Sequence, residues 1–163
     1  LRHSSAASDV YKRQILMNTK IIYMILTLAV LVGCQNSASN NESVKTVKAA
    51  YETFAAGDTD GWKALHSEDL TFTVFGDIAT SGVHKGPDAV IQDVFNVIPS
   101  VWPNFNIEHK HFFTDGDMVF VHSVMTADGL DTETLHMFEV VDGKIVMFKA
   151  FDDTHSMHIA SVK

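Results

Sequence analysis

The chain has 163 residues, with 12 Lys or Arg against 20 Asp or Glu and a formal charge of −8 at pH 7. From Cys34 onward there is no arginine, and 19 acidic residues stand against eight lysines, a charge of −11. This balance argues against a nucleic-acid partner and against charge-driven binding to anionic headgroups. Cys34 is the single cysteine, so the chain cannot form an internal disulfide.

The beginning of the chain carries an export pattern. Residues 1–16 resemble a translated sequencing-adaptor read-through, so we expect translation to begin at Met17; a short native extension is the alternative. In residues 17–33, a lysine precedes a 12-residue apolar run and small residues, as in secretory signal peptides. The run is shorter than the ~20 residues of a membrane-spanning helix, and a buried core helix is the alternative.

The end of that run, Leu31-Val32-Gly33-Cys34, resembles the lipobox of bacterial lipoproteins. The resemblance implies cleavage before Cys34, a lipid on its thiol and a membrane-anchored protein of the cell envelope. It implies the outer membrane if the host is Gram-negative. The polar residues 34–43 then form a tether, and residues 44–163 form one domain, long enough to bury a core.

The order of predicted elements is helices first and sheet second, which is typical of an α+β fold. An apolar stripe from Val44 to Phe54 predicts a helix that Ser43 caps and Gly57 ends. The remaining expected elements are a helix over 60–66, a strand over 70–75, a helix from 86 to the prolines at 99 and 103, and two hairpins (105–113 with 118–126, and 132–141 with 144–152). We expect the antiparallel sheet to curve around the first helix.

Five short sequence patterns occur in one order across residues 44–154. They are Tyr51-x-x-Phe54-Ala55-Ala56-Gly57-Asp58-x-Asp60, Gly86-Pro87-Asp88-Ala89-Val90, Trp102-Pro103-Asn104-Phe105, Asp115-Gly116-Asp117 before Val119-Phe120-Val121-His122-Ser123, and Asp142-Gly143-Lys144-Ile145-Val146. The ordered set resembles the SnoaL-like branch of the nuclear-transport-factor-2-like superfamily. That resemblance implies a cone-shaped, cystatin-like α+β fold with N-terminal helices, a pocket against the concave sheet, and often a homodimer.

The resemblance does not imply one reaction, because this fold hosts several enzyme classes and plain binding domains. At the positions of the ketosteroid isomerase base and oxyanion tyrosine this chain has Val74 and Ala50, and His136 replaces the buried acid. Limonene-epoxide hydrolases need an arginine that the domain lacks. The acidic base of SnoaL-type cyclases falls near Ala150; we expect Asp152 to replace it if a bulge or offset turns it inward.

Histidines are the most unusual feature of the predicted sheet. If Asp115-Gly116 is the turn of the first hairpin, His109 lies opposite His122, with His111 and Phe120 on the same face. His136 shares a face with Phe138 on the next strand. Up to four imidazoles would then line the pocket, although a one-residue register error would scatter them.

Three interpretations of these histidines remain open. They are semi-buried side chains satisfied by backbone or carboxylate partners, or a pocket acid/base, or a metal site of His109, His111 and His122. In the acid/base hypothesis, the catalytic residues are His136 or His122, with Asp152 or the neighbouring Asp153 orienting the ring.

The predicted function is binding of a small hydrophobic or polyketide-like molecule, with cofactor-free isomerase, cyclase or dehydratase chemistry as its catalytic form. The candidate ligand-binding residues are Tyr51, Trp62, His111, Phe120 and Phe138. Helical spacing with Phe54 and Leu65 favours the core for Tyr51 and Trp62, and a contact with a ligand is the alternative. A non-catalytic module of the envelope that binds a ligand or partner is the alternative function.

Overall fold

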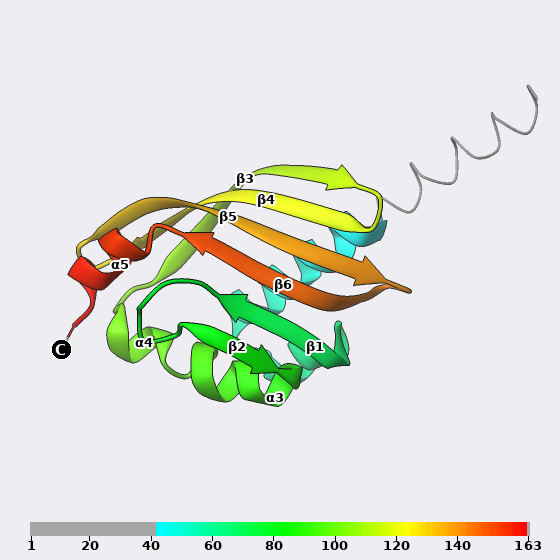
Figure 1. The fold of residues 1–163 in the computed structure, drawn as a ribbon, viewed down its shortest axis with the longest axis horizontal. Coiled ribbons are helices and arrows are strands. Elements are labelled where there is room, and N and C mark those ends of the chain that lie inside the picture. The colour runs from blue at the N-terminus through cyan, green and yellow to red at the C-terminus, as the bar shows by residue number, and fades with distance from the viewer. Residues whose placement is uncertain (1–41, 163) are drawn as a thin grey trace, which may run out of the picture. The chain divides into compact units, whose positions relative to one another are not determined.

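The computed structural model describes residues 42–162, and these form an α+β domain with a curved six-stranded sheet (Figure 1). The sheet order is β2-β1-β6-β5-β4-β3, with β1 parallel to β6 and every other neighbouring pair antiparallel. The strands are β1 (His66–Val74), β2 (Gly82–Lys85), β3 (Asn106–Asp115), β4 (Met118–Ala127), β5 (Leu130–Val141) and β6 (Lys144–Asp152). The predicted fold class is therefore confirmed.

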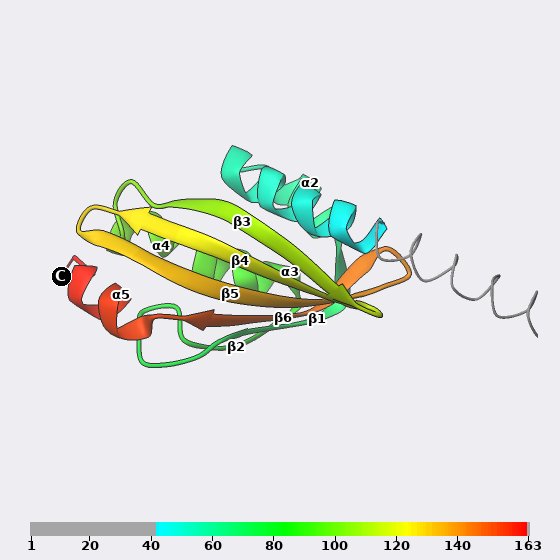
Figure 2. The same cartoon turned by 90° about the horizontal axis from the view of Figure 1, so that it is seen from above.

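Helices cover one face of this sheet. A helix occupies residues 42–56, followed by α2 (Thr59–Ala64), α3 (Gly86–Val90), a π-helical turn η1 (Ile91–Phe95), α4 (Ile98–Val101) and α5 (Thr154–Ala160). Figure 2 shows the first helix and α2 lying along the sheet. Gly57 ends the first helix with a φ of 69°, a conformation that costs glycine little. No helix among the described residues is long and apolar enough to cross a membrane.

The main core lies between the helices and the concave face of the sheet. Val47 and Ala50 of the first helix pack with Trp62 of α2 and with the inward-facing side chains of the sheet, and all of these side chains are buried. The inward positions alternate along the strands: Val119, Val121 and Ser123 of β4 are fully buried, whereas the residues between them are not. This alternation decides which predicted side chains can reach a cavity in the core.

The two hairpins differ in how well their turns were predicted. Val141 pairs with Lys144, so Asp142 and Gly143 form the expected turn, and both have the positive φ of a type I′ hairpin. In the first hairpin Asp115 pairs with Met118, so the turn is Gly116–Asp117. Here Gly116, with φ at 57°, occupies the first central position, as in a type II′ turn. The prediction that the turn is Asp115-Gly116 was therefore wrong.

Several other element predictions also need correction. The expected helix over 60–66 ends at Ala64, and β1 begins at His66 instead of Leu70. Strand β2 was not predicted, and Pro99 lies within α4 instead of ending a helix. Ser43 is helical and buried, inside the helix that it was expected to cap. The segment after β6, for which no element was predicted, is helix α5, anchored by the buried Met157.

Candidate functional site

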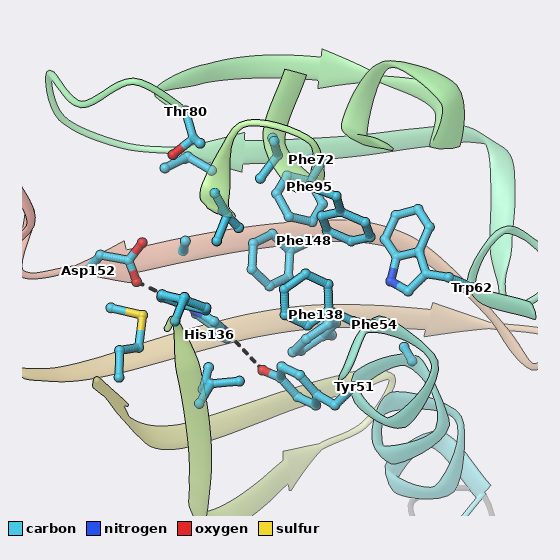
Figure 3. Close-up of a pocket in the computed structure, with 18 of the residues that line it drawn as sticks. Tyr51, Phe54, Trp62, Phe72, Thr80, Phe95, His136, Phe138, Phe148 and Asp152 are labelled. Carbon is cyan, nitrogen blue, oxygen red and sulfur yellow. Dashed lines mark hydrogen bonds and ion pairs between the residues drawn. The ribbon is translucent and has the colours of Figure 1, made fainter. Parts of the chain in front are cut away.

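A cavity of about 100 Å³ opens between the helices and the concave face of the sheet. Its walls are mainly aromatic, and Figure 3 shows phenylalanines from helices and strands facing each other across it. The aromatic residues labelled along this wall are Phe54, Trp62, Phe72, Phe95, Phe138 and Phe148. Such a wall suits an apolar ligand, because burial of apolar surface drives its binding.

One hydrogen-bonded chain of polar side chains interrupts this apolar wall. The hydroxyl of Tyr51 lies 2.7 Å from Nδ1 of His136, and Nε2 of the same ring lies 3.4 Å from Oδ1 of Asp152 (Figure 3). Thr134 donates its hydroxyl proton to the same carboxylate oxygen. The side chains of His136 and Asp152 are 10% and 7% exposed, so these groups meet in a largely dry environment. These hydrogen-bonded side chains connect the first helix to β5 and β6.

Strand periodicity places both His136 and Asp152 in the cavity. His136 pairs with Ala150 and Thr134 pairs with Asp152 in the continuous antiparallel register of β5 and β6. Because side chains two residues apart share a face, Asp152 points inward beside Ala150. The register of this pair of strands shifts between Glu139 and Val140, where Val146 is the extra residue of a bulge in β6. Ile145, before the bulge, is also buried, and without the bulge Asp152, seven residues further on, would face outward. A bulge therefore does turn Asp152 inward, as expected.

The hydrogen bonds and the charge around Asp152 keep its carboxylate ionised. Burial raises the pKa of Asp152, but hydrogen bonding to His136, the positive charge on that ring and the hydrogen bond from Thr134 together outweigh burial, so the pKa lies below its ordinary value. Oδ2 of Asp152 has no hydrogen-bond partner within residues 42–162, and in Figure 3 it carries no dashed line. The carboxylate therefore has one oxygen held by the protein and one free to accept a proton.

Tyr51, in contrast, remains a neutral phenol. Burial raises its pKa well above the ordinary value, and the negative charge of Asp152 raises it further. When His136 is neutral with its proton on Nε2, the Tyr51 hydroxyl donates to Nδ1. When His136 is cationic, Nδ1–H donates to the phenol oxygen, and the Tyr51 proton becomes available to a ligand. The protonation of His136 thus controls which way Tyr51 donates.

His66 lies at the other end of the cavity, against Trp62. Its Nδ1–H donates to the carbonyl oxygen of Trp62 over 2.7 Å, and the two rings stack with centroids 3.6 Å apart. Burial lowers the pKa of His66 to about 4, with the nearby Lys144 adding to the effect, although the bond to Trp62 opposes it. His66 is therefore neutral at physiological pH, with its unprotonated nitrogen at Nε2.

The two histidines of β3 point to opposite faces of the sheet. A bulge makes Ser123 the partner of His109 but His122 the partner of His111. His109 faces inward, where its ring contacts Tyr51 and its Nδ1 lies 3.0 Å from the Ser123 hydroxyl. Burial lowers the pKa of His109, and the charge of His136 lowers it further.

His111 and His122 lie on the outer face of the sheet, away from the cavity. Their rings stack with centroids 5.8 Å apart, and His122 pairs with Glu133. Phe120 occupies the same face of β4 as His122. The expectation that these three residues line the pocket was therefore wrong. Val119, Val121 and Ser123 are the residues of β4 that face inward, so Phe120 and His122 face outward with His111, and the bulge in β3 turns only His109 inward.

The same geometry removes the predicted metal site. His109, on the inner face, cannot converge with His111 and His122 on the outer one. No group of three His, Cys, Asp or Glu residues within the described chain is arranged to hold a metal ion.

The remaining predicted site residues are placed as follows. Tyr51, Trp62, Phe138, His136 and Asp152 line the cavity. Asp153 caps α5, accepting a hydrogen bond from the Ser156 amide, and does not orient a histidine. Cys34 lies outside the described residues.

Sequence reasoning missed two polar residues of the site. His66 was expected only as the end of a helix over 60–66. Its spacing of four from Trp62 is the signal that its side chain can reach a carbonyl in the last turn of a helix. Thr134 could not be found from the Asp142-Gly143 turn alone, because that turn pairs Asp152 with Glu133 until the register shift between Glu139 and Val140 moves the pairing by one residue.

Solved structures share this fold at low sequence identity. An NTF2-like protein of unknown function from Burkholderia pseudomallei K96243 is 22% identical, with a TM-score of 0.68 over 75% of this chain and 98% of that one. A candidate SnoaL-like polyketide cyclase from Jannaschia sp. CCS1 is 18% identical, with a TM-score of 0.64 over 74% and 91% of the two chains. TerC, crystallised with polyporic acid, is 20% identical, with a TM-score of 0.65 over 73% and 97%.

No curated protein matches the chain. The family model of the SnoaL-like domain matches residues 47–148, which include most of the first helix, strands β1 to β5, the first half of β6 and His136. Together with the six-stranded sheet and its cavity, this match identifies the chain as a member of the SnoaL-like domain family.

Proposed function

We propose that the domain binds a small, mainly apolar carbonyl compound and moves a proton at the carbon next to the carbonyl. The observation that carries this proposal is the hydrogen-bonded chain Tyr51–His136–Asp152, set in a mainly apolar cavity. Isomerisation, cyclisation and dehydration all begin with such a proton transfer, and none of them requires a cofactor when a base and an oxyanion donor are in place.

In this proposal each residue has one role. Asp152 accepts the carbon-bound proton on its free Oδ2, because its lowered pKa keeps it ionised. His136 positions the carboxylate, and both of its ring nitrogens are already engaged. When His136 is cationic and its Nδ1–H donates to the phenol oxygen, Tyr51 donates a hydrogen bond to the carbonyl oxygen as negative charge develops there. The raised pKa of Tyr51 keeps the phenol protonated in this role. The sequence-based hypothesis that His136 is itself the base is thereby modified.

The fold relatives support this class of chemistry. The Jannaschia protein is named as a candidate polyketide cyclase, and TerC was crystallised with polyporic acid. Their likeness to this chain is one of fold, so the proposed reaction depends on the residues of this cavity. We therefore propose a polyketide-like or similar hydrophobic carbonyl compound as the ligand class.

A simple carbon acid tests the chemistry without knowledge of the natural substrate. We expect the protein to accelerate exchange of the α-protons of 2-tetralone in deuterated buffer, followed by proton NMR. The variant Asp152→Asn should lose this acceleration by at least 100-fold, because an amide cannot accept the proton. Asp153→Asn is the matched control, since Asp153 caps α5 outside the cavity. Equal exchange rates in both variants would contradict the role of Asp152.

The second candidate function is a binding module without catalysis. It is favoured by Val74 and Ala50, which line the cavity where the resemblance to ketosteroid isomerases would require a base and a tyrosine. Binding of 2-tetralone with no faster exchange than in buffer would support this candidate over the enzyme.

We further propose export and lipid anchoring through Cys34, supported by the signal pattern of residues 17–33 and the lipobox resemblance.

A homodimer, implied by the family resemblance, also stays a prediction. The outer sheet face exposes Phe113, Leu135 and Phe151 at 57%, 40% and 47%, which would suit such an interface. Sedimentation of the wild type and of Leu135→Glu would test it; a monomeric wild type would contradict it.

A further inference from the structure

His66 and Trp62 form a second polar end of the cavity, distant from Asp152. Figure 3 shows Trp62 and Asp152 at opposite ends of the row of phenylalanines. Along the sheet, His66 pairs with Ile145 of β6, whereas Asp152 lies seven residues further along the same strand. At roughly 3.3 Å per residue, the two backbone positions are about 23 Å apart. A group at His66 therefore cannot belong to the Tyr51–His136–Asp152 chain.

The local structure determines which nitrogen of His66 is available. The Nδ1–H is used at the end of α2, where it donates to the Trp62 carbonyl. The neutral ring therefore carries its lone pair on Nε2. No group within residues 42–162 donates to that nitrogen, although the residue is only 6% exposed. No fully enclosed polar side-chain atom in the described chain lacks a partner, so Nε2 is not fully enclosed. Because His66 lines the cavity, a ligand bound there is the group that could reach Nε2.

A buried acceptor of this kind has a clear energetic consequence. A ligand that donates a hydrogen bond to Nε2 satisfies this acceptor. A ligand with an apolar group or an acceptor at the same place displaces any water there and leaves Nε2 without a hydrogen bond, which disfavours its binding. A cationic group on a ligand would bind less favourably at this end of the cavity. The positive charge of the nearby Lys144, which disfavours protonation of His66, would repel it as well. The stacked rings of Trp62 and His66 also offer an aromatic surface on which a flat ligand ring can pack.

We propose that His66 is a specificity-determining residue that accepts a hydrogen bond at Nε2 from a hydroxyl group on the ligand. The ligand class is then an aromatic or polycyclic compound with its reacting carbonyl near Asp152 and a hydroxyl group at the distal end. This inference rests on the proposed function, since it concerns the same cavity, but it adds a second recognition point that the proton-transfer chemistry does not require.

Two variants separate the two nitrogens of His66. In His66→Asn the amide NH₂ occupies the place of Nδ1 and can keep the bond to Trp62, but nothing replaces Nε2. In His66→Gln the longer side chain can bring its amide oxygen to the place of Nε2, while the bond to Trp62 is lost. A purely structural role predicts that Gln is the harmful change, whereas the proposed role predicts that Asn is.

The probes are 2-naphthol and its methyl ether, 2-methoxynaphthalene. Only 2-naphthol has a hydroxyl proton that it can donate in a hydrogen bond. Calorimetry on the full chain should show that the wild type prefers 2-naphthol by about tenfold, the effect of one buried hydrogen bond. His66→Asn should bind both probes alike, and His66→Gln should retain a preference. Nitrogen-15 NMR should show the Nε2 signal of His66 shifting with 2-naphthol and not with its methyl ether.

Other outcomes would overturn the inference in distinguishable ways. If the preference persists in His66→Asn but disappears in Asp152→Asn, the hydroxyl binds at the opposite end of the cavity and the role of His66 is wrong. If the wild type binds both probes equally, the cavity binds aromatic ligands but His66 does not select them. If neither probe binds at its solubility limit, both this inference and the proposed function fail.

Discussion

The burial of His66 makes the stability of the domain depend on pH, and replacement by asparagine should remove that dependence. His66 is 6% exposed and its pKa is lowered to about 4, against 6.5 for a free imidazole. Between these two pH values the unfolded chain binds a proton at this residue and the folded chain does not. The free energy of unfolding therefore falls as the pH decreases from about 6.5 to about 4, and the loss stops below that value.

The size of the effect follows from the pKa difference. One pKa unit corresponds to about 1.4 kcal/mol, so a shift from 6.5 to about 4 amounts to roughly 3 kcal/mol over the whole range. Between pH 7.5 and pH 4.5 most of this is expressed, which is about 2 to 3 kcal/mol. Such a loss is a large fraction of the roughly 5 to 15 kcal/mol that stabilise an average domain.

Urea denaturation, followed by circular dichroism at pH 7.5 and 4.5, measures the effect in the wild type and in His66→Asn. Carboxylates such as Asp152 titrate in both proteins, so the difference between the two pH dependences isolates His66. We expect the wild type to lose about 2 to 3 kcal/mol more than the variant. A parallel loss in both proteins would refute the argument that His66 is held neutral by burial.

Three further predictions concern other parts of the chain. Tyr51→Phe should cost about 1 kcal/mol in urea denaturation, since His136 loses its hydrogen-bond partner; an unchanged stability would contradict that bond. Thr134→Val should raise the pKa of Asp152 in a carbon-13 NMR titration, because one of the hydrogen bonds that lower it is removed; an unchanged pKa would show that Thr134 does not contribute. Cys34→Ala should release the protein from the membrane fraction, and its retention there would overturn the lipid anchor.

Features that depend on neighbouring residues could be predicted from the sequence, whereas features that depend on strand pairing could not. The facing of His136 and Phe138 was predicted because a strand alternates its side chains regardless of what it pairs with. The Asp142-Gly143 turn was predicted because that dipeptide favours positive φ at both positions. The position of the first hairpin turn was not, because Asp115-Gly116-Asp117 is compatible with either of two adjacent turns and local preference does not choose between them.

The sequence by itself therefore determined the fold class, the acidic charge and the inward position of His136 on its strand. Tertiary structure decided which polar groups meet: the bulge in β3 separates His109 from His111, and the pairing of β5 with β6 brings Thr134 and Asp152 together. It also placed His66 in the cavity through a contact with Trp62 at the end of α2. The physical reason is that secondary structure follows from short-range patterns, whereas a site depends on strand register, and a shift of one residue turns every side chain to the opposite face.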